Sequence, residues 1–352
     1  MMYLSDFRAH LRADPRGLIP ASLYLANHNL ANHKKNAFMS RGFLLAFVLL
    51  LSGCLPKEPL VQIPSAENIR QLSDGRIFIT GKDALYQLQQ DEQGFRTVPV
   101  ARDTRCSYFA GLAELNQWLF FVCAQSSGLR LGDLKFDQAG VLKAYSLEDG
   151  RLIDVMALSG FQFPNGLDAL PEQNAILIAD EDFFVAQGGV SKAVFDFSAG
   201  EPVLSDYVQH WIGPQQQVYA ANGVRVWEGD IYLTDIGFFK RVPLQVDGTP
   251  GAAQILYRNL TVLDDFDRYC DGFLITDFVK GRLVYVPVDG SAVRVSPPGL
   301  SSPSAILAQP GSGFQAGSVL VTESRGVQAG QGNQLVMVDL AALGVETCSE
   351  AP

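Results

Sequence analysis

Residues 222–235 read Asn-Gly-Val-Arg-Val-Trp-Glu-Gly-Asp-Ile-Tyr-Leu-Thr-Asp. Apolar residues alternate with other residues in the first half, and the turn Glu228-Gly229 leads into an apolar stretch that ends at Asp235. Alternation with a period of two, interrupted by a short glycine-containing turn, predicts a β-hairpin. This hairpin opens with an amide residue and closes with an acidic one, and both features recur along the chain.

The same unit can be followed through the chain six times. Clear copies open at Asn165 and Asp264, and weaker copies open at Glu67, Ser107 and Ser304. The six opening residues are 40, 58, 57, 42 and 40 positions apart, a spacing that is typical of four-stranded propeller blades with variable loops. No long amphipathic helix follows residue 54. The sequence therefore predicts an all-β fold, a six-bladed β-propeller of four-stranded blades.

The first 53 residues have the features of a targeting segment. Basic residues precede an unbroken apolar run over residues 43–51, which ends in Leu-Ser-Gly-Cys54. This run is about half of the roughly 20 residues that a membrane-spanning helix needs, so a cleaved signal peptide is predicted. Its last four residues resemble the lipobox of bacterial lipoproteins, which implies lipidation of Cys54. Met39 is an alternative start of the chain.

These features predict four segments. Residues 1–53 form an extension and signal peptide, residues 54–63 a lipidated cysteine with a short tether, residues 64–345 the propeller, and residues 346–352 a tail. The lipid anchor implies a membrane partner and a place in the cell envelope, and Leu55 after the cysteine favours the outer membrane.

Charge and cysteine content narrow the function classes. The leader holds six of the 27 basic and two of the 37 acidic residues, so residues 54–352 carry 21 basic and 35 acidic residues, a net charge of −14. Nucleic acid is therefore not an expected partner. Four cysteines follow Cys54, and an exported protein can join them in two disulfides. Cys106 with Cys123 is the first choice, which leaves Cys270 with Cys348; free buried cysteines are the alternative.

The opening residues of the six hairpins are candidates for a site. In a propeller the innermost strand of each blade faces the central channel, so equivalent positions converge on one axis. The sequence places carboxylates there at Glu67, Asp264 and the adjacent Asp265, and amides at Asn165 and Asn222. Such an oxygen-rich set suits Ca²⁺ better than zinc. The alternative is that these residues only form turns and satisfy backbone groups.

Four segments that contain these opening residues resemble the calcium-dependent six-bladed propellers. That superfamily includes gluconolactonase, senescence marker protein and paraoxonase. The four segments are residues 65–81, 164–184, 221–235 and 263–277. The resemblance implies that Glu67, Asn165, Asn222, Asp264 and Asp265 hold one catalytic Ca²⁺. It also implies hydrolysis of a small lactone or aryl ester, with Asp264 as the candidate general base.

Two departures from the family affect this interpretation. Gln125 stands where paraoxonase has the first histidine of its catalytic dyad, and residues 105–108 replace the segment that supplies a substrate-binding Asn in gluconolactonase-like proteins. Propellers that resemble strictosidine synthase do not depend on a metal, but all the metal positions are matched here. The competing hypothesis is a non-catalytic envelope lipoprotein that binds or scaffolds another envelope protein.

Three other features are more simply explained as structural. His210 is the single histidine after residue 54 and is predicted to be a loop or packing residue. Arg105 and Arg325 are candidates for holding an anionic substrate group, and surface ion pairs are the simpler role. The acidic run 180–182 is predicted to be a solvated loop rather than a second calcium site.

Overall fold

The computed structural model describes residues 55–125, 129–130, 135–136, 140–182, 187–311, 313–324 and 333–345. Cys54, Arg325 and Cys348 lie outside these residues, as do the predicted signal peptide and the tail. The described residues contain 26 strands and three 3-10 helices. None of these helices is long and apolar enough to cross a membrane.

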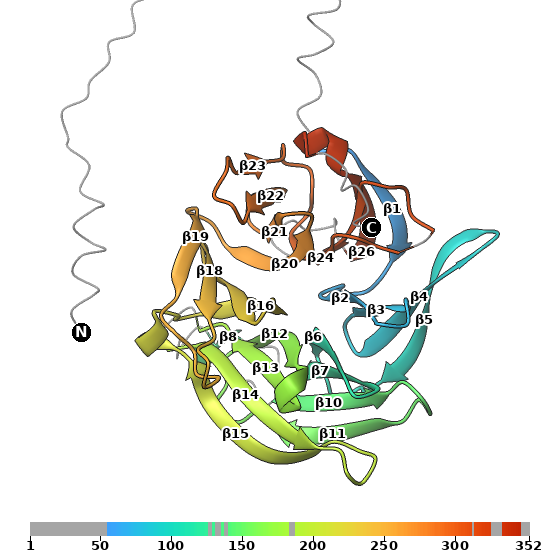
Figure 1. The fold of residues 1–352 in the computed structure, drawn as a ribbon. Helices are drawn as coiled ribbons and strands as arrows, with labels where there is room; N and C mark the ends of the chain where they lie inside the picture. Colours follow the sequence, from blue (N-terminus) through green and yellow to red (C-terminus); the bar gives the residue numbers. More distant parts are fainter. Residues whose placement is uncertain are drawn as a thin grey trace, which may run out of the picture. The chain divides into compact units, whose positions relative to one another are not determined.

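Six four-stranded antiparallel sheets are arranged around a central axis (Figure 1). This confirms the predicted all-β fold, the six blades and their four strands. Blade 1 is β2(Ile69–Gln71)–β3(Ile77–Thr80)–β4(Ala84–Asp91)–β5(Gly94–Arg102), and blade 2 is β6(Tyr108–Leu115)–β7(Trp118–Ala124)–β10(Gly140–Ser146)–β11(Leu152–Ala157). Blade 3 is β12(Pro164–Leu170)–β13(Ala175–Asp180)–β14(Gly189–Asp196)–β15(Val203–Ile212), and blade 4 is β16(Ala221–Trp227)–β17(Asp230–Asp235)–β18(Phe238–Pro243)–β19(Gln254–Arg258). Blade 5 is β20(Leu263–Tyr269)–β21(Gly272–Asp277)–β22(Arg282–Pro287)–β23(Arg294–Val295), and blade 6 is β24(Pro303–Leu307)–β25(Ser318–Glu323)–β26(Gln334–Asp339)–β1(Lys57–Gln62).

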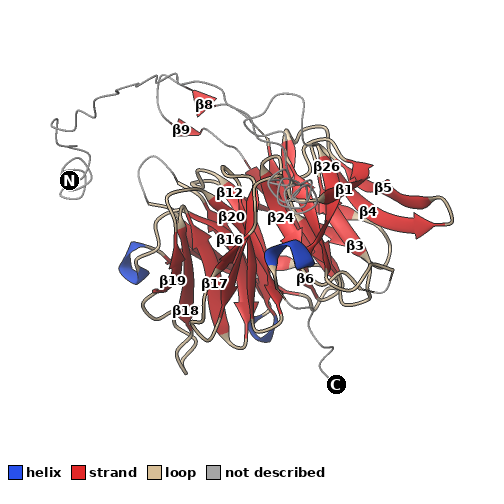
Figure 2. Ribbon diagram, turned by 90° about the horizontal axis from the view of Figure 1, so that it is seen from above, coloured by secondary structure: helices blue, strands red, loops and turns tan. Residues whose placement is uncertain are grey.

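The remaining elements are short. A two-stranded ribbon, β8(Leu129–Arg130) with β9(Lys135–Phe136), lies between β7 and β10 in the sequence. The 3-10 helices are Pro171–Gln173, Pro214–Gln216 and Leu340–Leu343. Figure 2 shows the sheets from the side, with the helices outside them.

The ring of blades is closed by the N-terminal strand. β1 pairs antiparallel with β26 and forms the outermost strand of blade 6. Residues 57–62, which the sequence analysis assigned to a tether, thus belong to the propeller. Leu55 is also packed: it is 3% exposed, and its N–H donates to the Pro298 carbonyl at 2.9 Å. The propeller is therefore closed within residues 55–345.

The core is divided among the interfaces between blades. The buried apolar residues form six clusters, and each cluster is built mainly from two neighbouring blades. Successive side chains of a strand point to opposite faces. In β13, Ile176 and Ile178 pack toward blade 2, whereas Leu177 and Ala179 pack toward blade 4. Second strands such as β7 and β13 are consequently apolar at nearly every position, because both faces of each sheet are covered.

Candidate metal site at the propeller axis

The innermost strands share a two-residue bulge at one level of the channel. The pairing of β12 with β13 shifts between Pro164 and Leu167, which leaves Asn165-Gly166 out of register. Equivalent shifts occur at Asn222-Gly223, Asp264-Asp265, Ser304-Ala305 and Gly111-Leu112. A bulge re-aims side chains at the point where strict pairing ends. We call the first residue of each bulge, together with Glu67 in blade 1, the axial ring: Glu67, Gly111, Asn165, Asn222, Asp264 and Ser304.

Blade 2 contributes no side chain to the axial ring. Its strand begins three residues before its bulge, so the ring position is Gly111 and not Ser107 as the sequence repeat suggested. Gly111 has a φ of +58°, and a Cβ there would stand 2.4 Å from the carbonyl oxygen of Asn165. Only glycine fits this close approach. Ser107 instead donates its hydroxyl hydrogen bond to the Ala124 carbonyl at 2.9 Å.

Threonines on the second strands link the ring residues of neighbouring blades. The Thr322 hydroxyl accepts the Ala305 N–H and donates to the Glu67 carbonyl, both at 2.8 Å. Thr276 does the same between Asp265 and the Ser304 carbonyl, at 3.0 and 3.1 Å. Thr234 connects Gly223 with the Asp264 carbonyl. These buried hydrogen bonds fix the backbone of the ring from blade 4 through blade 6 to blade 1. The sequence analysis did not single out these threonines.

The acidic residues at the ends of the second strands hold the loops that lead into the innermost strands. Asp180 accepts the N–H groups of residues 162 and 163, at 2.9 and 2.7 Å. Asp235 accepts the Ala220 N–H and Glu323 the Ser301 N–H, each at 2.7 Å. Asp277 accepts a hydrogen bond from the Thr261 hydroxyl. These carboxylates are therefore structural, and they set the positions from which the ring residues project.

Three carboxyl groups from different blades interact through their charges near the axis, although their oxygens do not all lie within 4.8 Å of one another. Asp264 is 6% exposed and Glu181, which directly follows β13, is 2% exposed. The Asn222 side-chain amide donates to Glu181 at 3.0 Å. The negative charges of Glu67 and Glu181 both act on Asp264. The predicted residues Glu67, Asn222 and Asp264 are thus brought together, and Glu181 joins them.

Burial and mutual repulsion raise the pKa values of these carboxyl groups. Burial raises the pKa of Glu67 to about 7, and the charge of Asp265 adds to this shift. Burial, with the charges of Glu67, Glu181 and Asp265, raises the pKa of Asp264 well above its usual range. Burial also raises the pKa of Glu181 well above that range, against the opposing hydrogen bond from Asn222. The cluster therefore favours a bound cation, which would remove the repulsion.

Asp265 occupies a different position from Asp264. One of its oxygens lies 2.6 Å from the guanidinium of Arg225, and its carboxylate is almost fully buried. Its other oxygen, Oδ1, has no hydrogen-bond partner. Arg225 therefore balances the charge of Asp265, and the unpartnered Oδ1 lies beside Gly223 of the neighbouring blade. The sequence analysis had no reason to assign Arg225 this role.

Several buried oxygens at this level lack hydrogen-bond partners. They are Oδ1 of Asn165, Oε1 of Glu181 and Oδ1 of Asp265. Unsatisfied buried polar atoms are rare in folded proteins and commonly mark a place for water or an ion. All of these atoms are oxygens, as are the ligands that Ca²⁺ takes in groups of six to eight. The donor set therefore fits Ca²⁺.

The acidic run 180–182 is not a solvated loop. All three side chains are buried, with exposed fractions of 1%, 2% and 4%. The prediction failed because a run of three acidic residues ordinarily marks a solvated surface, whereas here each carboxylate lies in the top of blade 3 or at the axis. The signal that could have identified Glu181 is its place directly after a strand equivalent to those ending at Asp235 and Asp277.

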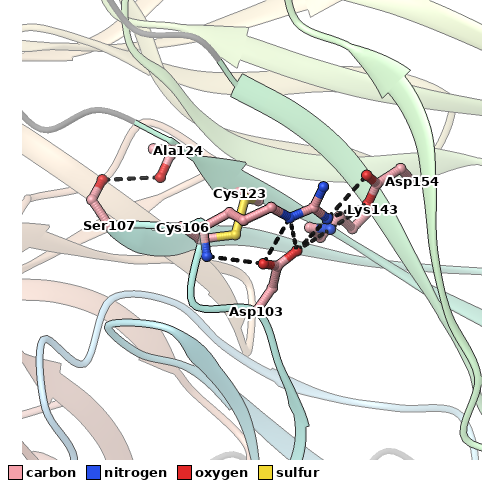
Figure 3. The surroundings of a disulfide bond; sticks show 8 residues. Asp103, Cys106, Ser107, Cys123, Ala124, Lys143 and Asp154 are labelled. Carbon is pink, nitrogen blue, oxygen red and sulfur yellow. Dashed lines mark hydrogen bonds and ion pairs between the residues drawn. A yellow bond between two sulfur atoms is a disulfide. The ribbon is translucent and has the colours of Figure 1, made fainter.

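The secondary candidates are not part of the axial ring. Arg105 contacts Asp103 at 2.6 Å and Asp154 at 3.1 Å, beside a buried Lys143 that contacts both carboxylates (Figure 3). These ion pairs account for Arg105 without a substrate. His210 belongs to the outermost strand of blade 3, β15, and its Nε2 lies 3.8 Å from a carboxylate oxygen of Asp180.

Cys106 and Cys123 form a disulfide next to this ion-pair cluster (Figure 3). The bond joins the turn before β6 to β7 and is the pairing that the sequence analysis chose first. Cys270 is disulfide-bonded as well; Cys348, its predicted partner, lies outside the described residues. Gln125, which stands in place of a catalytic histidine, directly follows β7.

No protein-family model matches the sequence, and no curated protein is similar to it. Solved structures are similar in fold at low sequence identity. A gluconolactonase from Xanthomonas campestris is 15% identical, with a TM-score of 0.53 over 82% of this chain and 92% of the gluconolactonase. A luciferin-regenerating enzyme is 9% identical, with a TM-score of 0.53 over 84% of this chain and 98% of the enzyme. A chain of a nidogen/laminin complex is 13% identical, with a TM-score of 0.53 over 76% of this chain and 89% of its own length. The chain thus shares its six-bladed propeller fold with two enzymes and with a component of a protein–protein complex.

Proposed function

We propose that the protein is a Ca²⁺-dependent hydrolase of lactones or aryl esters, anchored to the cell envelope by a lipid on Cys54. The observation that carries the proposal is the electrostatic interaction of Glu67, Glu181 and Asp264 near the axis, beside buried oxygens that lack partners. Its support from known structures is limited to the fold, which a gluconolactonase shares.

The residues in and beside the axial ring would have different roles in binding the ion and in the reaction. Glu67, Asn165, Asn222 and Asp264 would hold the ion, and Glu181 and Asp265 each offer a further oxygen. When bound, Ca²⁺ supplies a positive charge that polarises a substrate carbonyl and stabilises the developing oxyanion. Asp264 is the candidate base for an attacking water. A bound Ca²⁺ would lower the pKa of Asp264 again and keep its carboxylate ionised, as a proton acceptor must be.

The alternative function is a non-catalytic envelope module in which the ring residues are structural. The nidogen/laminin chain shows that this fold also occurs in a protein–protein complex. The unpartnered oxygens favour the metal site, because a purely structural cluster would be expected to satisfy its buried polar atoms internally.

Calorimetric titration of residues 55–352 with Ca²⁺ tests the metal site. We expect one ion per chain in the wild type and at least a hundredfold weaker binding in Asp264→Asn. Asp267→Asn is the matched control, because it removes one buried carboxylate from the same strand three residues beyond the ring. Equal binding by wild type and Asp264→Asn would refute the site.

A panel of lactones and aryl esters, assayed with Ca²⁺ and with EDTA, tests the reaction. We expect hydrolysis that EDTA abolishes, that Ca²⁺ restores and that Asp264→Asn lacks. Tight Ca²⁺ binding without hydrolysis of any member of a broad panel would favour the binding module.

A further inference from the structure

A second site lies in the channel beyond the axial ring. A cavity of about 200 Å³ is enclosed by the later parts of the innermost strands of blades 1, 3, 4, 5 and 6. Its charged lining residues Arg70, Asp168, Arg225 and Asp267 each stand three positions after a ring residue. At about 3.3 Å per residue, this places the cavity up to roughly 10 Å further along the axis. We call this cavity the lower chamber.

Half of the residues that line the lower chamber are apolar, and the others are five charged residues and Gln71. Its apolar lining is Ile69, Val226, Trp227, Phe273, Ile306 and Leu307. Concave sites that bind small molecules typically combine such walls with a small number of convergent polar groups. A cavity of about 150 Å³ accommodates benzene, so the chamber can hold a molecule of that size with one small polar substituent.

The carboxylates of the chamber are already engaged. Asp168 lies 2.7 Å from the Arg70 guanidinium and accepts the Val226 N–H at 2.6 Å. Asp267 accepts the N–H groups of Ala308 and Arg268, both at 2.8 Å. Both are therefore held by cationic or backbone donors and leave little capacity for a cationic ligand.

The guanidinium groups are less completely engaged. Arg225 directs one nitrogen to the Val224 carbonyl at 2.8 Å and another to Asp265 at 2.6 Å. Arg268 donates to the Gly272 carbonyl at 2.7 Å and stacks on Trp227 at 4.1 Å. Within the described residues, no carboxylate forms an ion pair with Arg268. Since a guanidinium has five N–H donors, Arg268 retains several for a ligand.

We propose that the lower chamber binds a small monocarboxylate with an apolar body, such as benzoate, through Arg268 and Arg225. A planar carboxylate matches the paired donors of a guanidinium, and the apolar body would lie against Trp227 and the aliphatic walls. The side chain of Arg70 remains 25% exposed, which leaves the chamber in contact with solvent. This proposal does not depend on a metal at the axial ring.

Titration of residues 55–352 with benzoate, followed by calorimetry and by Trp227 fluorescence, tests the proposal. Benzamide is the neutral control ligand of the same shape. We expect one benzoate per chain, bound at least tenfold more tightly than benzamide, with and without EDTA. Arg268→Gln should abolish this preference and Arg268→Lys should retain part of it. Arg102→Gln, which removes an exposed arginine of the outer strand β5, should change nothing.

Three results would overturn the proposal. One is equal or undetectable binding of benzoate and benzamide by the wild type. Another is full retention of the preference in Arg268→Gln, with thermal unfolding showing that the variant is folded. The third is benzoate binding that disappears in EDTA, because that would place the ligand at the axial ring. Loss of the fluorescence change in Trp227→Phe would assign that signal to the lower chamber.

Discussion

Replacement of Thr322 by valine tests how the ring of blades is held closed at the axis. The Thr322 hydroxyl connects the Ala305 N–H of blade 6 with the Glu67 carbonyl of blade 1, each at 2.8 Å, and the side chain is fully buried. Valine has nearly the same shape, so the substitution leaves no cavity. It removes the hydroxyl that serves both backbone groups.

The expected cost follows from those two groups. Leaving a buried donor or acceptor unsatisfied costs about 1–3 kcal/mol, so the loss of both should reduce the free energy of unfolding by about 2–4 kcal/mol. A change of 1 kcal/mol shifts the melting temperature of a domain of about 150–250 residues by roughly 2–4 °C. We expect a decrease of about 5–10 °C, together with weaker Ca²⁺ binding because the Glu67 backbone loses its support.

Urea denaturation of Thr322→Val and wild type provides the measurement. Thr97→Val is the control, since Thr97 lies in the outermost strand β5 with its side chain partly exposed. Surface substitutions usually change the free energy of unfolding by no more than about 0.5 kcal/mol. If the free energy of unfolding of Thr322→Val differs from that of wild type by no more than this, the threonine hydrogen bonds do not stabilise the closure of the ring.

Three further predictions concern the channel and the disulfide. Because the pKa of Glu67 is raised from 4.5 to about 7, its titration alone should cost the metal-free protein about 3 kcal/mol of stability as pH rises from about 4.5 to 7; denaturation in EDTA at pH 5 and pH 7.5 measures this, and equal stability would contradict it. Benzoate and Ca²⁺ should each tighten the binding of the other, because a carboxylate at Arg225 frees Asp265 for the metal; titrations of each in the presence of the other measure the coupling, which must be equal in both directions. Replacement of both Cys106 and Cys123 by alanine should lower the free energy of unfolding by about 3 kcal/mol, because a disulfide that closes a loop of 17 residues restricts the unfolded chain by about that amount. An unchanged melting temperature would show that the disulfide does not stabilise the fold.

The six blades could be predicted because each innermost hairpin has its own local signal. An amide or carboxylate opens the first hairpin in four blades, and an acidic residue ends the second strand in four blades. The first residue faces the axis and the second holds the entering loop. Asn222 with Asp235 and Asp264 with Asp277 follow this rule directly. The repeated sequence pattern therefore corresponds to a repeated local geometry of the innermost hairpins.

The parts that were not predicted depend on contacts between blades. Gly111 could not be recognised as a ring position because its bulge lies three residues into β6, and the strand start at residue 108 gave the repeat a different register. Glu181 became a site residue only through its hydrogen bond with Asn222 from the next blade. Residues 57–62 carry no local sign that they complete the last blade, since their partner β26 lies more than 270 positions away.

The burial of Leu55 determines how freely the propeller could move if Cys54 carries a lipid. A peptide linker of ten residues would let an anchored domain rotate in all directions above a bilayer. Leu55 is instead fixed between the last two blades, with its N–H bonded to the Pro298 carbonyl. A lipid on the adjacent Cys54 would then be joined to the propeller by almost no flexible linker. One edge of the propeller would therefore stay close to the lipid headgroups. Its accessible orientations would be few, so that its encounters with substrates or partners would depend on the direction from which they approach the membrane.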